Sequence, residues 1–102
     1  MVLMKVSSNT NVGSLAGAIA GVVKEEGRVE AKCVGAAALN KLVKAVILAR
    51  KFVITEGIDL YMVPSFETVP HSSGEGEISV IKMLIEARTK TRLDGESNVQ
   101  SV

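Results

Sequence analysis

The first third of the chain changes twice between an alternating and a helical pattern of apolar residues. Alternation at the start predicts a short strand over 2–7. Apolar residues then recur every three or four positions, which predicts a helix over 12–26 with Thr10 or Asn11 as its N-cap. Charged and apolar residues alternate again over 28–33, which is typical of a strand with one solvated face.

The rest of the domain starts with the longest helical pattern. The segment 36–53 has no Gly or Pro and predicts a second helix. Alternation over 58–63 predicts a third strand, which Pro64 either ends or marks as an edge strand. The Gly-rich segment 70–76 indicates a hairpin loop, and we expect 77–88 to be the fourth strand, although its second half also has good helix composition.

This order of elements predicts an α+β fold, a two-layer sandwich of the order strand-helix-strand-helix-strand-strand. Both helices should cover one face of a four-stranded mixed sheet. The 102 residues are the usual size of one domain. We therefore expect a single domain over 1–89 and a loose C-terminal tail over 90–102, which has few bulky apolar residues.

One layer of helices cannot bury both faces of the last two strands, and apolar residues occupy both. The residues expected on the outer face are Tyr61, Val63, Val80 and Leu84. Soluble monomers rarely expose a large apolar patch, and a second copy of the chain can cover such a patch symmetrically. The pattern therefore predicts a homodimer that associates through this face.

Composition narrows the possible functions. Apolar residues make up 47% of the chain and aromatic ones 3%, which argues against disorder and against a base-stacking surface. With one Cys and one His, we expect no enzyme activity, no metal site and no cofactor. The first residues resemble neither a signal peptide nor a spanning helix, so we expect a cytoplasmic protein without membrane contact.

Two polar strand-to-helix junctions are the best candidates for binding. Free backbone N–H groups and the helix dipole favour a phosphate at such a junction, although an ordinary capped helix start explains the first one as well. In the predicted topology both junctions lie at the same end of the sheet, where they would form a phosphate-binding edge for nucleic acid. Its candidate residues are Ser7, Ser8, Asn9, Thr10, Asn11, Asn40, Lys41 and Lys44.

Glycines recur every fourth residue in the first predicted helix, at Gly13, Gly17 and Gly21. Each glycine inside a helix costs about 1 kcal/mol relative to Ala, so a close contact should offset it. We expect tight packing on the second helix or on the sheet, and contact with a nucleic-acid backbone is the alternative.

Several runs of residues together resemble one known family. They are Lys5-Val-Ser-Ser, Gly13-Ser-Leu-Ala-Gly-Ala-Ile-Ala-Gly21, Gly35-Ala-Ala-Ala-Leu-Asn-Lys41 and Gly57-Ile-Asp-Leu60. Over residues 2–89 the chain looks like the stage V sporulation protein S family, which is similar in turn to the Alba-like fold of dimeric chromatin and RNA-binding proteins. The resemblance implies a small bacterial protein that binds DNA or RNA and acts in sporulation or a related developmental process.

Charge modifies what the resemblance implies. Twelve Lys and Arg against eleven Asp and Glu leave a net charge of +1, the first junction contains no Lys, and the last hairpin carries Glu67, Glu75 and Glu77. We therefore expect weak, electrostatic binding with little sequence preference. The acidic hairpin favours an alternative function, a dimeric protein–protein interaction regulator without direct nucleic-acid binding. A sensor of a small anion at the first junction is a third possibility.

Overall fold

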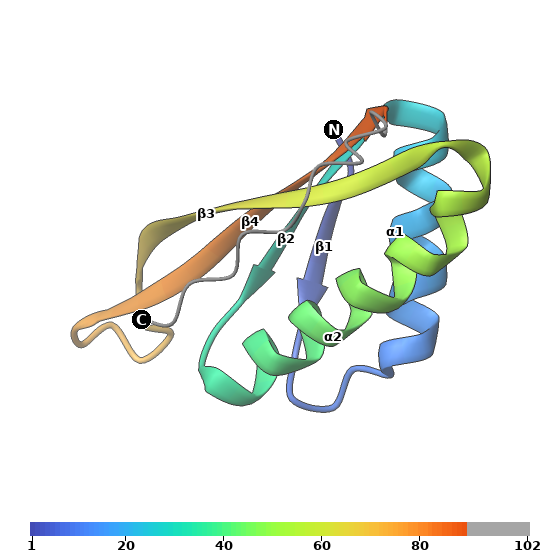
Figure 1. Cartoon of the computed structure of the whole chain (residues 1–102). Coiled ribbons are helices and arrows are strands. Elements are labelled where there is room, and N and C mark those ends of the chain that lie inside the picture. Colours follow the sequence, from blue (N-terminus) through green and yellow to red (C-terminus); the bar gives the residue numbers. More distant parts are fainter. Residues whose placement is uncertain (90–102) are drawn as a thin grey trace, which may run out of the picture.

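A computed structural model describes residues 1–89 of the chain, and the tail expected over 90–102 lies outside them. The two helices cover one face of a four-stranded sheet (Figure 1). The α+β two-layer sandwich predicted from the sequence is confirmed. The elements in chain order are β1 (Leu3–Val6), α1 (Val12–Glu26), β2 (Arg28–Cys33), α2 (Ala36–Val53), a short 3-10 helix η1 (Ile54–Glu56), β3 (Ile58–Pro70) and β4 (Glu77–Thr89).

The strands are arranged in the order β1-β2-β4-β3. β1 and β2 are parallel, and β4 pairs antiparallel with both β2 and β3. β3 runs seven residues beyond the predicted 58–63, and Pro64 pairs with Met83 inside it. Because β3 lies at the edge of the sheet, a proline without an N–H is tolerated there, so the edge-strand interpretation of Pro64 is confirmed.

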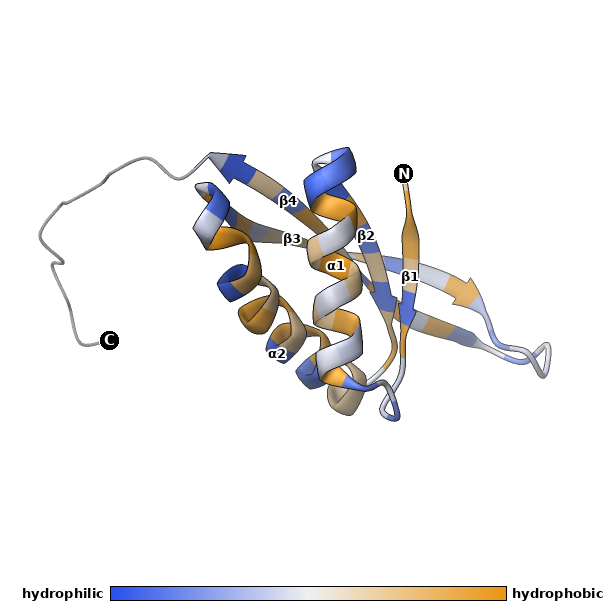
Figure 2. Cartoon of the chain, turned by 90° about the vertical axis from the view of Figure 1, so that its right-hand side faces the viewer, coloured by the Kyte–Doolittle hydropathy of each residue, from blue (hydrophilic) through white to orange (hydrophobic). Residues whose placement is uncertain are grey.

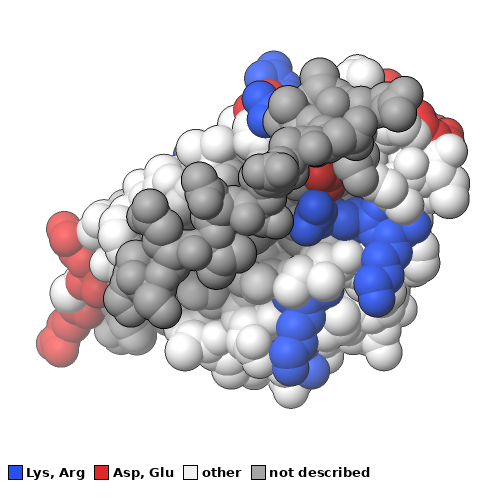
Figure 3. Space-filling model, in the orientation of Figure 1, with Lys and Arg blue, Asp and Glu red and all other residues white. Residues whose placement is uncertain are grey.

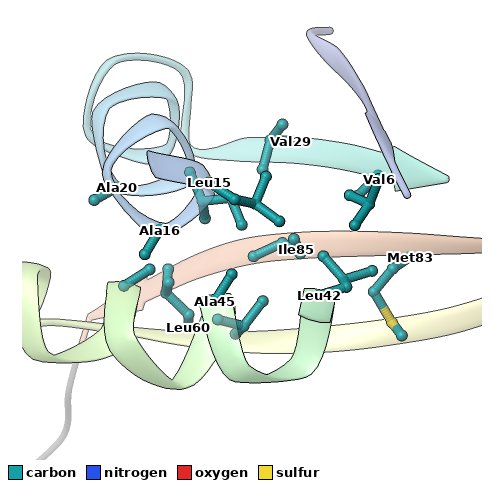
Figure 4. Packing of buried hydrophobic residues seen from close by; sticks show 14 of the residues in the cluster. Val6, Leu15, Ala16, Ala20, Val29, Leu42, Ala45, Leu60, Met83 and Ile85 are labelled. Atoms are coloured by element: carbon teal, nitrogen blue, oxygen red, sulfur yellow. The ribbon is translucent and has the colours of Figure 1, made fainter. Parts of the chain in front are cut away.

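The core lies between the helices and the inner face of the sheet. Ala16 and Ala45 are completely buried, and such small side chains let the helices pack closely on each other and on the sheet. Figure 4 shows them next to Leu42, Leu60 and Ile85, and Figure 2 shows orange apolar segments along the helices. Burying one Leu or Ile side chain contributes about 1.5–3 kcal/mol, so the burial of this layer is a large favourable contribution to folding.

The residues that flank α1 explain where it begins and ends; of the two expected N-caps, Asn11 is the one observed. The Asn11 side chain caps the helix by accepting a hydrogen bond from the Ser14 N–H at 2.9 Å. Gly27 ends it in the left-handed region, with φ of 81°, and its N–H donates to the carbonyl of Val23. No helix within residues 1–89 combines the length and the apolar character needed to cross a membrane.

The glycines of α1 do not pack as expected. Gly17 and Gly21 are exposed, and a Cβ added at either position would meet no atom within 4 Å. The expected tight packing on α2 or on the sheet is therefore wrong: α2 and the sheet pack on the opposite side of α1, through residues such as Ala16 and Ile19. Both glycines therefore destabilise the helix relative to Ala. No contact among residues 1–89 offsets this cost.

This cost can be measured. We expect Gly17→Ala and Gly21→Ala each to raise the free energy of unfolding by about 0.5–1 kcal/mol, because the new methyl group fits in open space and restricts the unfolded chain. The matched control, Gly27→Ala, should lower it by roughly 1 kcal/mol because Ala is strained at positive φ. Urea denaturation measures all three. If Gly17→Ala lowers the free energy of unfolding, the exposed glycine side of α1 is in close contact with another part of the protein or with a second molecule.

Candidate functional site

The two strand-to-helix junctions meet around one cavity. Because β1 and β2 are parallel neighbours, they end at the same edge of the sheet. The cavity there has a volume of about 750 Å³ and places Ser7 and Ser8 near the first turn of α2. Its lining residues are Lys5, Val6, Ser7, Ser8, Lys32, Cys33, Val34, Gly35, Ala36, Ala37, Ala38, Val69 and Val80.

The first turn of α2 supplies hydrogen-bond donors to this edge. Its N-cap is Gly35, with φ of 85°, and no side chain caps the helix. The first intrahelical bond is donated by the N–H of Leu39, so the N–H groups of Ala36, Ala37 and Ala38 have no partner within the helix. Uncapped N–H groups together with the positive end of the helix dipole favour an anion.

The first junction uses many of its polar groups internally. The Ser7 N–H donates to Thr10 Oγ1 at 2.8 Å, and the Asn9 N–H donates to Ser7 Oγ at 3.2 Å. Asn11 is occupied in capping α1. The start of α1 is thus an ordinary capped helix, and the open donors of this edge belong to α2. The exposed side chains of Ser7 and Ser8 still border the cavity.

Two lysines at the cavity were not among the predicted site residues. The register pairs Lys5 of β1 with Lys32 of β2, so both point to the outer face of the sheet and both line the cavity. Lys32 Nζ lies 2.8 Å from Glu67 Oε2, whereas Lys5 has no ion pair within residues 1–89. The alternating pattern of each strand could have predicted that its lysine points to the outer face of the sheet. That Lys5 and Lys32 are neighbours follows only from the parallel register of β1 and β2.

The predicted residues of α2 lie outside the cavity. Asn40 and Lys44 are exposed, and Lys41 is half-buried. Lys and Arg side chains gather over α2, while acidic side chains mark the end of the molecule formed by the β3–β4 hairpin (Figure 3). The structure thus brings Ser7 and Ser8 to the cavity, whereas Asn40, Lys41 and Lys44 do not line it. Asn9, Thr10 and Asn11 do not line the cavity.

The outer face of the sheet carries an ion-pair network. Besides its contact with Lys32, Glu67 Oε2 lies 4.0 Å from Lys82 Nζ, which is also 4.0 Å from Glu30 Oε2. The close ammonium group of Lys32 is the main reason that the pKa of Glu67 is lowered. The middle of this face is therefore charged, unlike the apolar surface expected from the sequence.

The four residues predicted to join two copies differ in exposure. Tyr61 and Val63 are 39% and 46% exposed, and the guanidinium of Arg88 lies 4.7 Å from the centre of the Tyr61 ring. Leu84 is half-buried. Val80 is 8% exposed, so the expectation that it lies uncovered is wrong: it lines the cavity where the hairpin passes the ends of β1 and β2. Association through this face stays a prediction.

The surroundings of Cys33 and His71 indicate that both residues have structural roles. Cys33 is 2% exposed, and its burial raises the pKa of the thiol, which keeps it in the neutral form. His71 Nδ1 lies 3.1 Å from the backbone nitrogen of Ser73 and accepts its hydrogen bond in the turn between β3 and β4. The side chain of His71 thus helps to shape the turn.

The sequence of the chain matches the model of one protein family, described as Stage V sporulation protein S, over residues 2–88. The chain belongs to the stage V sporulation protein S family. Among solved structures, Alba from Thermoplasma volcanium is similar, with a TM-score of 0.57 and 15% sequence identity. The match covers 82% of this chain and 98% of that chain. At this identity the likeness shows the fold, which is Alba-like, as the sequence resemblance implied.

The ion pair of Glu67 should be visible in acid denaturation. Because the pKa of Glu67 is lowered in the folded state, its ionised form stabilises folding at neutral pH. This contribution is lost as the pH falls from the usual carboxyl pKa of about 4.3 towards the lower folded-state value. We expect Glu67→Gln to lower the Tm at pH 7 and to reduce the loss of Tm between neutral and acidic pH. Parallel Tm-versus-pH curves for the two proteins would contradict the role of this ion pair.

Proposed function

We propose that this member of the stage V sporulation protein S family is a small non-enzymatic protein that binds the phosphate backbone of DNA or RNA. The observation that carries the proposal is the uncapped start of α2, which lines one cavity together with Lys5, Ser7 and Ser8. Lys and Arg side chains also lie over α2 (Figure 3). The Alba-like fold, common to chromatin and RNA-binding proteins, supports it. We infer a cytoplasmic, developmental role from the family.

In this proposal the donors and the lysines have different tasks. The N–H groups of Ala36–Ala38 and the hydroxyls of Ser7 and Ser8 donate hydrogen bonds to phosphate oxygens and fix the position of the backbone. Lys5, Lys41 and Lys44 supply charge; none of them forms an ion pair within residues 1–89. Contacts to phosphates carry no base information, so binding depends little on sequence.

Salt dependence measures how many phosphates are contacted. Three free lysines and one helix start reach about two to four phosphates per subunit, so we expect a slope of roughly −2 to −4 for log K against log salt concentration on duplex DNA. A titration of duplex DNA, single-stranded DNA and RNA over a series of salt concentrations gives the slope. A complex that is insensitive to salt would contradict backbone binding.

Charge reversal locates the contact. Replacing Lys41 and Lys44 by Glu leaves the buried residues of α2 unchanged, so the fold should survive while affinity for nucleic acid falls at least about tenfold, or about 1.4 kcal/mol. Lys5→Glu tests the cavity in the same way. Glu75→Ala, at the hairpin end, should change affinity little. If the double variant binds as tightly as the parent, the basic side of α2 is not part of the interface.

A second candidate function is a dimeric interaction regulator that does not contact nucleic acid. The acidic hairpin end favours it, because Glu75 and Glu77 are exposed there and would repel a phosphate backbone. The salt titration distinguishes the two functions, since only the first predicts binding at low salt.

A further inference from the structure

Three lysines lie in line across the outer face of the sheet. The strand register pairs Lys5 of β1 with Lys32 of β2, and Lys32 with Lys82 of β4. We call these three residues the lysine row. Neighbouring strands are about 4.8 Å apart, so the three side chains start from adjacent backbone positions. Like charges directly opposite each other destabilise a sheet, so the lysine row needs negative charge nearby.

Two carboxylates of the protein supply part of that charge. Glu67 Oε2 lies 2.8 Å from Lys32 Nζ and 4.0 Å from Lys82 Nζ. Glu30 Oε2 lies 4.0 Å from Lys82 Nζ. Lys5 forms no ion pair within residues 1–89. Among the ion pairs of this part of the chain, the three positive charges of the row thus face two negative ones, which leaves the row attractive to a further anion.

Glu67 is held at the lysine row without a hydrogen bond. Its Oε2 atom is shielded from solvent, yet it accepts no hydrogen bond within residues 1–89, so its contact with Lys32 is an ion pair without hydrogen-bond geometry. The side chain as a whole is 33% exposed and belongs to the edge strand β3, so it can turn towards water. Releasing Lys32 therefore costs Glu67 an ion pair but no hydrogen bond.

The lysine row leads into the cavity at the strand-to-helix junctions. Lys5 and Lys32 line this cavity together with the uncapped start of α2. Glu67 pairs across the hairpin with Val80, which also lines the cavity, so the carboxylate that holds Lys32 lies at the cavity border. A phosphate oxygen in the cavity and the carboxylate of Glu67 therefore compete for the same ammonium group.

We propose that the lysine row extends the phosphate-contact surface from the cavity onto the outer face of the sheet, and that Glu67 is an internal competitor for this surface. When a nucleic-acid backbone binds, Lys32 exchanges Glu67 for a phosphate oxygen, and Glu67 turns to solvent. Lys82 loses one of its two carboxylate neighbours in the same step and becomes available to a neighbouring phosphate. The proposal rests on the phosphate-binding function proposed above, since its ligand is the same backbone.

Removing the competitor should strengthen binding. Glu67→Gln keeps the shape of the side chain and removes its charge, so the affinity of the full chain for duplex DNA should rise roughly fivefold at low salt, because no ion pair has to be broken. The slope of log K against log salt concentration should become more negative by about one, because Lys32 then neutralises a phosphate without leaving Glu67 unpaired. Fluorescence anisotropy over a series of salt concentrations measures both quantities.

Glu75→Gln is the matched control. It makes the same change of net charge on the same hairpin, but Glu75 forms no ion pair within residues 1–89. Its affinity should change by less than about twofold, because salt screens a distant exposed charge. If both variants strengthen binding equally, only net charge matters and Glu67 is not a competitor. If Glu67→Gln weakens binding, Glu67 positions Lys32 for the ligand and the proposal is wrong.

A double-mutant cycle tests whether Lys32 is the group that is exchanged. Lys32→Gln should lower the affinity of the parent by less than about twofold, since Glu67 already neutralises this lysine, but lower that of Glu67→Gln by roughly fivefold. Equal losses in the two backgrounds would contradict the competition. Glu67→Asp, which keeps the charge on a shorter side chain, should give a gain of affinity between those of the parent and Glu67→Gln.

Lys82 tests how far the contact surface extends over the sheet. In the Glu67→Gln background, Lys82→Gln should lower the affinity roughly threefold and make the salt slope less negative by about one. Lys51→Gln removes the same charge from the last turn of α2, far from the cavity, and should change the affinity by less than about twofold. An unchanged affinity in the Lys82→Gln variant would overturn the extension onto the outer face.

The same titrations separate this proposal from the proposed function. If neither the parent nor Glu67→Gln binds duplex DNA, single-stranded DNA or RNA at low salt, both are wrong. If the parent binds and charge reversal at Lys41 and Lys44 weakens it, while Glu67→Gln changes neither affinity nor slope, the function stands and the competition by Glu67 is wrong. Far-UV circular dichroism at the titration temperature, matching that of the parent, shows that each variant is folded.

Discussion

The burial of β4 on one side is the constraint on which the rest of the structure depends. β4 lies between β2 and β3, and its Ile85 is completely buried under the helices. The helices reach it closely because the residues that face it include several alanines, among them Ala16 and Ala45. With so few aromatic residues in the chain, close packing of small and branched side chains is the means of filling the core.

This arrangement also determines where binding groups can lie. A parallel β1–β2 pair joined by α1 requires both strands to end at one edge, and both helices start from that edge. At the start of α1 the Asn11 side chain accepts a hydrogen bond from a backbone N–H group. At the start of α2 Gly35 has no side chain, so no side-chain cap forms there. The difference between an Asn and a Gly at two equivalent positions therefore decides which helix offers its N–H groups to a ligand.

The two faces of the β3–β4 hairpin differ in polarity because the helices pack on only one face of the sheet. The inner face of the hairpin is apolar, but the helices cover only part of it, which leaves an apolar groove beside Phe66. On the outer face, cross-strand neighbours form the network around Glu67 and Lys82. A partner that buried this outer network would have to desolvate its charges, whereas burying Phe66 removes apolar surface from water.

The sequence by itself determined the fold class, the bounds of α1, β2 and α2, and the family, because these depend on local periodicity and on residues close together in the chain. It narrowed the N-cap of α1 to Thr10 or Asn11, and the structure shows that the cap is Asn11. Only the tertiary structure decided that Gly17 and Gly21 face solvent, that Val80 is buried and that Lys5 lies beside Lys32. Each of these depends on which surfaces meet across the fold, and a one-dimensional pattern shows that a face exists without showing what covers it.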